Sequence, residues 1–271
     1  MPHIIPVSDP GDPRLEPYRD VQDRDLRGRD GFMAEGVTVL GNAIGRSRHR
    51  FQSLMVAEPR LAGLEGILAR LSEETPVYVA PPDVMSAIAG FHIHRGVLAH
   101  GERGTGDDPA SLLAGLPGRA LVVAAFGISN HDNLGGIFRN AVAFGADGVL
   151  LDPACCDPLY RKAIRVSVGA SLICPFARAQ SDAALMRALQ STSLEPVALS
   201  LKGEADIGRI AAGQPGIALL VGSEGHGLPD AAIDGAQGFR IPMAPGFDSL
   251  NAATATGIAL HAAARALGKL G

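Results

Sequence analysis

The stretch Ile241-Pro-Met-Ala-Pro-Gly-Phe-Asp-Ser-Leu-Asn-Ala-Ala-Thr-Ala-Thr-Gly257 says more about the fold than any other part of the chain. A short apolar strand leads into a loop rich in Pro and Gly, and the polar step Ser249-Leu-Asn251 then opens a helix. The first turns of this helix carry almost only Ala, Thr and Gly. Small residues let another backbone, a ligand or a partner subunit approach closely. The stretch therefore predicts a strand–loop–helix unit that forms a binding edge.

The sequence before this stretch alternates apolar strands with helices. We expect strands at residues 120–126, 148–151, 171–174, 196–201, 217–221 and 239–241. We expect helices at residues 134–144, 158–168, 182–191 and 250–267. Repeated strand–helix–strand units are typical of a parallel sheet with helices on both faces, so the expected fold class is α/β.

The first hundred residues predict a smaller α/β unit. Residues 1–30 are rich in Asp, Arg and Pro, which indicates an extended lead-in with one short charged helix. The apolar spacing then predicts helices at 32–45, 61–71 and 82–89 and strands at 51–57, 77–79 and 96–99. Five Gly and two Pro between His100 and Arg119 indicate a linker. The expected organisation is a domain at 1–100, a linker at 101–118 and a second domain at 119–271.

The composition excludes several classes of protein. The 271 residues are 46% apolar and 19% charged, so a sizeable core can form. The net charge of −4 gives no global field that attracts nucleic acid, so an RNA site would need a local patch. The chain has no apolar run of 18 residues and no signal-peptide pattern at its N-terminus, which favours a cytoplasmic protein without a membrane span. The spacing of Cys155, Cys156 and Cys174 indicates reduced thiols.

Three loops with unusual chemistry each follow a strand, at the edge where open α/β sheets bind ligands. The first contains Asn133, which we expect to cap a helix, and Arg139 six residues later. The second holds three glycines in six residues, with Glu224 among them. The third carries Ser249, expected as a helix cap, and Asn251. Singly, each loop is also consistent with an ordinary capped helix or Gly-rich turn, but together they predict a ligand site.

These motifs resemble those of the SpoU/TrmH family of RNA ribose 2′-O-methyltransferases in the SPOUT superfamily. The resemblance covers about residues 118–267 and rests on Asn133-Leu-Gly-Gly-Ile-Phe-Arg139, Leu220-Val-Gly-Ser-Glu-Gly-His-Gly-Leu228, and Ile241-Pro-Met243 with Ser249-Leu-Asn251. At Phe32-Met-Ala-Glu-Gly36 the N-terminal unit resembles the family's substrate-binding domain, which is related to a ribosomal-protein fold. The resemblance implies a C-terminal trefoil knot, S-adenosylmethionine as cofactor, and a homodimer whose active site uses both subunits.

The resemblance also implies roles for individual residues. Arg139 would be the catalytic residue beside the target ribose and phosphate, and the site would be completed by Asn133, Glu224, Ser249 and Asn251. The cofactor would be held mainly by the backbone at Gly222, Ile241 and Leu250, with Met243 adjacent. The family proposal makes the Arg a base. Because guanidinium groups keep their proton in proteins, we expect Arg139 to bind phosphate with two hydrogen bonds instead. Asn140 follows it where relatives often have Ser or Thr.

RNA contact is expected at basic residues of the N-terminal unit, namely Arg46, Arg48, Arg50 and Arg95, although a solvated charged face is the alternative for each. The expected activity is transfer of a methyl group from S-adenosylmethionine to a ribose 2′-hydroxyl of rRNA or tRNA, without a metal. One alternative is a non-catalytic RNA-binding protein that keeps the fold. Another is a Rossmann-type nucleotide enzyme, which the absence of a Gly-rich loop after the first strand disfavours.

Overall fold

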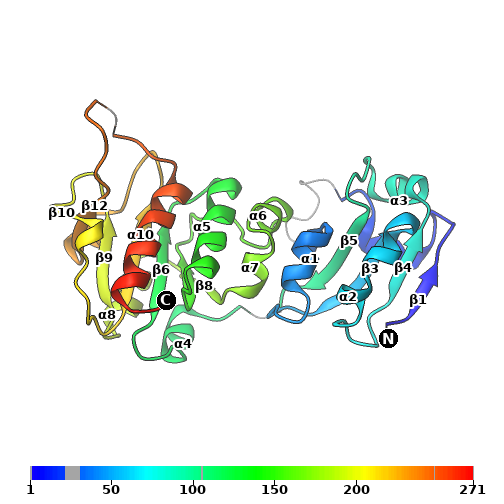
Figure 1. Ribbon diagram of the computed structural model, residues 1–271, viewed down its shortest axis with the longest axis horizontal. Coiled ribbons are helices and arrows are strands. Elements are labelled where there is room, and N and C mark those ends of the chain that lie inside the picture. The colour runs from blue at the N-terminus through cyan, green and yellow to red at the C-terminus, as the bar shows by residue number, and fades with distance from the viewer. Residues whose placement is uncertain (1, 22–30, 105, 247, 271) are drawn as a thin grey trace. The chain divides into compact units, whose positions relative to one another are not determined.

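The computed structural model describes residues 2–21, 31–104, 106–246 and 248–270, which form two compact units (Figure 1). Unit 1 comprises residues 1–105 together with 158–173. Unit 2 comprises residues 106–157 and 174–271. No helix in the described ranges is both long and apolar enough to cross a bilayer.

Unit 1 is built on a five-stranded sheet in the order β1-β4-β3-β5-β2. The strands are β1 (Ile4–Pro6), β2 (Gly31–Glu35), β3 (Phe51–Ala57), β4 (Val77–Ala80) and β5 (Val97–Glu102). β1, β4 and β3 run parallel, whereas β5 pairs antiparallel with both β3 and β2. Its described helices are η1 (Pro13–Tyr18), α1 (Val37–Ala43), η2 (Glu58–Gly63), α2 (Glu65–Leu68), α3 (Pro82–Ala89), α6 (Arg161–Val166) and α7 (Ala170–Ile173).

The strand at 51–57 and the helix at 82–89 are confirmed, but two helices expected in unit 1 are wrong in part. Residues 32–35 lie in β2, where pairing with β5 buries them, and the chain turns at Gly36 with φ +98° before α1 begins. The helix expected at 61–71 is divided into η2 and α2 at Leu64. The expectation for 1–30 is met by β1 and η1, and its last part, 22–30, lies outside the described residues.

The segment 158–173 belongs to unit 1 although it lies between two strands of unit 2 in the sequence. The Arg161 guanidinium meets the Glu35 carboxylate at 3.5 Å, with both side chains about nine-tenths buried. The Asn42 amide donates to the Val168 carbonyl at 2.9 Å. Because of these contacts, segment 158–173 packs within unit 1 and is not the helix of unit 2 that the strand–helix alternation of the sequence predicts.

Unit 2 contains a seven-stranded sheet in the order β10-β12-β9-β11-β6-β7-β8, in which every neighbouring pair is parallel. The strands are β6 (Leu121–Phe126), β7 (Gly148–Leu151), β8 (Phe176–Arg178), β9 (Glu195–Leu199), β10 (Ala205–Asp206), β11 (Ile217–Gly222) and β12 (Gln237–Arg240). The prediction of an α/β fold with a parallel sheet is confirmed.

One strand expected between β7 and α8 (Asp182–Gln190) is wrong. Residues 171–174 were expected to be a strand, but 170–173 form α7, and the strand follows at β8. Local hydrogen bonds favour the helical turn, because Ser171 N donates to the Ser167 hydroxyl and Leu172 N donates to the Gly169 carbonyl.

The described helices of unit 2 are α4 (Pro109–Ala114), α5 (His131–Ala143), α8 (Asp182–Gln190), η3 (Ile207–Arg209), α9 (Asp230–Asp234) and α10 (Ala252–Ala266). Helix α4 lies in the range expected as a linker, and the Asp108 carboxylate caps it by accepting from Ala110 N and Ser111 N. The sheet core is aliphatic, with Val122, Leu150, Leu185 and Leu220 buried.

Helices α5 and α10 lie side by side in unit 2 (Figure 1). A Cβ built at Gly136 of α5 would stand 2.5 Å from the Ala253 Cβ of α10. The Asn140 amide donates to the Ala253 carbonyl at 2.7 Å. Part of the small-residue face of α10 therefore packs against a helix of the same chain.

Candidate active site

Two of the three loops begin side by side at one edge of the unit 2 sheet. Strands β6 and β11 are parallel neighbours, and their register pairs Phe126 with Gly222. The loop after β6 and the loop after β11 therefore leave the sheet at the same level. Parallel strands place such loops at the carboxyl edge, where α/β proteins bind ligands.

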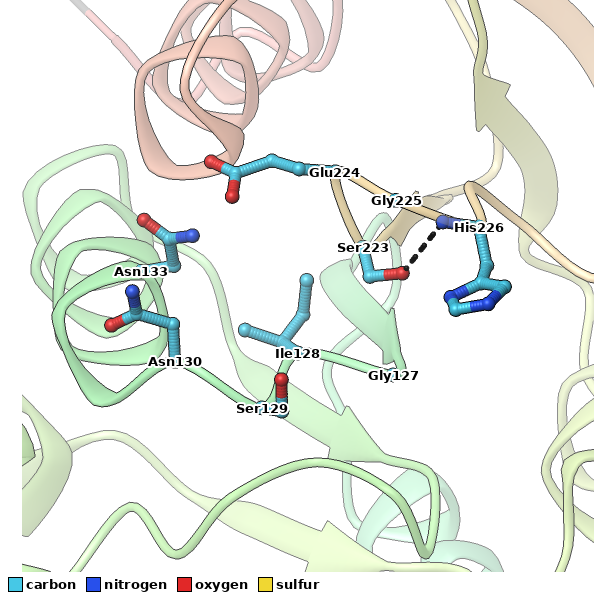
Figure 2. Close-up of a pocket in the computed structure, with 9 residues that line it drawn as sticks. All are labelled: Gly127, Ile128, Ser129, Asn130, Asn133, Ser223, Glu224, Gly225 and His226. Atoms are coloured by element: carbon cyan, nitrogen blue, oxygen red, sulfur yellow. Dashed lines mark hydrogen bonds between the residues drawn. The ribbon is translucent and has the colours of Figure 1, made fainter.

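These two loops enclose a cavity of about 250 Å³ (Figure 2). Its lining residues are Gly127, Ile128, Ser129, Asn130, Asn133, Ser223, Glu224, Gly225 and His226. In Figure 2 the Glu224 carboxylate reaches from the β11 loop toward the side of α5 that carries Asn133, and His226 lies on the opposite side. The polar groups are amides, hydroxyls, backbone groups, one carboxylate and the His226 imidazole, a set that suits ribose hydroxyls and base nitrogens.

Three residues expected in the catalytic site form one hydrogen-bonded cluster. The Asn251 amide donates to the Asn133 side-chain oxygen at 2.7 Å and to Glu224 Oε1 at 3.3 Å. Glu224 Oε1 also accepts from Ala252 N, the first amide of α10, at 3.1 Å. The structure thus brings together one residue from each of the three loops.

The helix caps near the cavity differ from those expected. Asn130, not Asn133, caps α5, since its side chain accepts from Asp132 N at 2.8 Å. Asn133 lies one turn further on and is 6% exposed. Because its side chain does not cap α5, it can bond with Asn251 at the start of α10. Asn251, not Ser249, caps α10, because its oxygen accepts from Ala253 N and Thr254 N. A capping side chain accepts from the backbone amides two and three residues after it. By this criterion the cap of α5 lies three residues before Asn133, and the cap of α10 lies two residues after Ser249.

The second loop depends on glycine where it returns to its strand. A Cβ at Gly222 would lie 2.1 Å from the Gly227 carbonyl carbon, closer than any real contact. Gly227 has φ +70°, a conformation that favours glycine. The Ser223 hydroxyl accepts from His226 N at 3.3 Å and closes the turn between them (Figure 2). The loop therefore forms a tight, backbone-rich wall.

Arg139 and Ser249 do not line the cavity. Arg139 is exposed on α5, and no hydrogen bond or ion pair joins it to any described residue. Ser249 is exposed in the segment before α10. Arg139 is therefore a cation available to a ligand, whereas no hydrogen bond joins the Ser249 side chain to another described residue.

The residues expected to hold the cofactor are divided between two places. Gly222 ends β11 beside the cavity. Ile241, Met243 and Leu250 are half-buried in the segment between β12 and α10, and none of them lines the cavity. Several residues that line the cavity were not expected from the sequence, namely Gly127, Ile128, Ser129, Asn130, Ser223, Gly225 and His226. These residues lie within or beside the quoted motifs, and that position is the sequence signal that could have identified them.

The basic residues expected to contact RNA lie in unit 1. Arg46, Arg48 and Arg50 lie in the turn between α1 and β3, and all three are exposed. The Arg50 guanidinium is 3.6 Å from the Glu74 carboxylate, in a pair with both side chains at least 70% exposed, which contributes little stability. Arg95 is also exposed. Among the described residues, no group of three or more His, Cys, Asp or Glu is arranged to hold a metal ion.

Several known proteins are similar to this chain. The model of the SpoU rRNA Methylase family matches residues 120–261. An uncharacterized tRNA/rRNA methyltransferase of Mycobacterium tuberculosis strain H37Rv is 39% identical over 264 residues, which cover 94% of this chain and 90% of the relative. The AdoMet-bound rRNA methyltransferase from Sinorhizobium meliloti has a TM-score of 0.79 at 27% identity, covering 97% of this chain and 98% of that one. A protein solved for the 2-OH methylation of C/U34 on tRNA has a TM-score of 0.50 at 27% identity, covering 58% of this chain and 96% of its own.

Proposed function

The chain belongs to the SpoU rRNA methylase family, and from that premise we propose that it transfers a methyl group to a ribose 2′-hydroxyl of rRNA or tRNA. It is a methyltransferase of this family, and its cofactor is S-adenosylmethionine. The similarity to a protein of 2-OH methylation on tRNA supports the ribose hydroxyl as the acceptor. The same proposal places the activity in the cytoplasm, where rRNA and tRNA are found.

The observation that carries this proposal is the convergence of Asn133, Glu224 and Asn251. Asn133 and Glu224 lie 118 and 27 positions before Asn251 in the sequence, yet the Asn251 amide group bonds to both. Each lies in a different motif, and none of the bonds is needed for the sheet. A fixed polar cluster beside a cavity is the arrangement that orients a hydroxyl-bearing substrate.

The residues of unit 2 fit the cofactor. The cavity is lined by two glycine-containing loops whose backbone groups can approach a ligand closely. Its neutral amide and hydroxyl groups match the ribose and base of a nucleoside. S-adenosylmethionine supplies a methyl group on a positively charged sulfur. The chain's task is then to place the acceptor hydroxyl in line with that group.

Arg139 and Glu224 take different parts in this proposal. Arg139 binds the phosphate next to the target ribose with two hydrogen bonds and so orients the 2′-hydroxyl. Glu224 holds the start of α10 and the Asn251 amide, so its carboxylate oxygen Oε1 is already engaged and acts as a positioning group. Asn133 fixes the third side of the cluster. The remaining roles are those that the family resemblance implies. The cofactor is held at Gly222, Ile241, Met243 and Leu250, and Ser249 bonds to the ribose or the cofactor.

Two structural parts of the proposal follow from the family. We propose that unit 2 carries the family's trefoil knot and that the protein acts as a homodimer. The exposed face of α10, which presents Thr254, Ile258 and His261, is where we propose that a second copy packs.

Mapping of ribose methylation in total RNA, from cells with and without the gene, tests the function. We expect one or a few 2′-O-methyl sites to disappear in rRNA or tRNA and to return on expression of the wild-type chain. Calorimetry with S-adenosylmethionine accompanies it, because a protein that only binds RNA has no need of the cofactor. An unchanged methylation map together with no cofactor binding contradicts the proposal.

A further inference from the structure

The cavity wall formed by Gly127 and Ile128 is held from behind by the loop that follows β7. Gly127 N donates to Asp152 Oδ2 at 2.8 Å. Ile128 N donates to the Cys155 sulfur at 3.4 Å, and the Ile128 carbonyl accepts from Cys156 N at 2.8 Å. Three of the four polar backbone groups of the wall are therefore bonded to one short segment.

Asp152 is the centre of this support. Its side chain is almost fully buried, with the residue 3% exposed. Its Oδ2 accepts a hydrogen bond from Gly127 N, and its Oδ1 accepts one from Cys155 N at 2.7 Å. A buried carboxylate with both oxygens bonded to backbone amides cannot be replaced without leaving donors unsatisfied. Asp152 thus links the end of β7 to the wall of the cavity.

Arg178, at the end of β8, shapes the same segment from the other side. Its guanidinium donates to the carbonyls of Asp152, Cys155 and Cys156 at 2.9, 2.7 and 2.9 Å. One rigid group with several donors fixes three carbonyls at once. Burial, reinforced by the nearby Asp152 charge, raises the pKa of the Cys155 thiol above its usual range. The thiol therefore keeps its proton and can donate to the Ala125 carbonyl at 3.4 Å.

We propose that Asp152 and Arg178 are positioning residues for methyl transfer, acting through the Gly127–Ile128 wall. The wall leads within two residues to Asn130, the cap of α5, and so to the helix that carries Asn133 and Arg139. Displacement of the wall moves both the cavity lining and the start of that helix. A misplacement of about 1 Å at a reacting centre can cost roughly 100-fold in rate.

The chain contains a matched control at the opposite end of β7. Asp147 precedes β7, and its Oδ2 accepts from Leu121 N, the first residue of β6, at 2.8 Å. Asp152 follows β7 and accepts from Gly127 N, directly after the last residue of β6. The Asp147 carboxylate also meets the Lys269 ammonium at 2.8 Å. Asp147 bonds the first residue of β6 and Asp152 bonds the residue directly after its last, but only Asp152 does so at the cavity.

The test compares Asp152→Asn, Arg178→Lys and Asp147→Asn with the wild type. Amide hydrogen exchange at residues 127–130 is measured without any ligand, and kcat and KM are measured with labelled S-adenosylmethionine and total RNA from cells lacking the gene. In Asp152→Asn an amide nitrogen faces one backbone N–H. We expect exchange at 127–130 to quicken at least about tenfold and kcat to fall about 10- to 100-fold, with a smaller rise in KM for the cofactor, because the wall also lines the cavity. Arg178→Lys should follow with smaller changes, and Asp147→Asn should leave both readouts near the wild type.

This inference rests on the proposed function, but the two fail in different ways. If the wild type transfers no methyl group to RNA, the function fails while the exchange measurement still reports on the wall. If exchange at 127–130 is the same in Asp152→Asn and Asp147→Asn, or if both lose the same activity, the positioning role is wrong. Should Asp152→Asn not fold, Arg178→Lys carries the comparison, because it keeps the buried carboxylate and weakens only the grip on the carbonyls.

Discussion

Asn251 shows how much one side chain contributes at this site. Its oxygen caps α10 through Ala253 N and Thr254 N, while its amide holds Asn133 and Glu224. An N-cap needs only an acceptor, so Ser, Thr or Asp would serve the helix equally well. Among these capping residues, only Asn offers both an acceptor for the cap and an NH2 group with two donors for further oxygens. The residue type is therefore explained by the cluster, and the cap alone does not explain it.

Replacement of Asn251 separates these two roles. Asn251→Ala should lower the free energy of unfolding by about 1 kcal/mol, the usual cost of a lost cap, and should also abolish most methyl transfer. Ser181→Ala is the matched control, because Ser181 caps α8 through Ala184 N at 3.1 Å and lies outside the cavity. It should cost similar stability in urea unfolding and leave activity unchanged. Equal activity in the two variants would show that the Asn251 amide has no part in the reaction.

Arg139 is exposed and unpaired within the described chain, so its replacement should leave the fold intact. We expect Arg139→Ala to lower kcat/KM at least about 100-fold, since the phosphate clamp is lost. Arg139→Lys should lose nearly as much, because a single ammonium cannot reproduce two parallel hydrogen bonds. Arg187→Ala, on the exposed face of α8, serves as the control. Substantial activity in Arg139→Lys would argue for a base at this position instead of a clamp.

At the scale of elements, the sequence predicted those parts whose pattern is local. Five of the seven described strands of the parallel sheet were found from apolar runs, and β7 was placed to the residue, but β8 and β10 were missed. The errors have two kinds of cause. Residues 32–35 became a strand because distant β5 pairs with them. Residues 170–173 became a helix because local hydrogen bonds, such as that from Ser171 N to the Ser167 hydroxyl, are not visible in the apolar pattern. The site motifs were found, but the wall behind the cavity was not, since Asp152 and Arg178 meet it only in the folded sheet.

The contact between α5 and α10 offers a test of element packing. Gly136→Ala places a methyl group 2.5 Å from the Ala253 Cβ and should destabilise unit 2 by about 1–3 kcal/mol. The double variant Gly136→Ala with Ala253→Gly moves the methyl group from one helix to the other and should recover most of the loss. Urea unfolding of the two single variants and the double variant measures this coupling. Additive effects would mean that the helices do not touch as described.

At the scale of the whole molecule, the chain passes between the two units three times, after residues 105, 157 and 173. The segment 158–173 is inserted between β7 and β8 but packs within unit 1, where the Arg161–Glu35 pair anchors it. The methyltransferase family model begins at residue 120, so the residues before it, including the basic turn at 46–50, lie outside the matched range. We propose that unit 1 binds the RNA whose ribose is methylated in unit 2.

Neutralising the basic turn tests this division of labour. The net charge of the chain is −4, so attraction of RNA must come from local arginines, whose phosphate contacts weaken as salt rises. Changing Arg46, Arg48 and Arg50 together to Gln should weaken RNA binding about 10- to 100-fold at low salt and flatten its salt dependence by about two to three counterions. A control with the same charge change replaces the exposed Arg14, Arg187 and Arg209 by Gln and should keep the salt slope. Because the turn lies in unit 1, S-adenosylmethionine affinity should stay constant in both triple variants. Equal losses of RNA affinity in the two would mean that net charge, and not this turn, attracts the RNA.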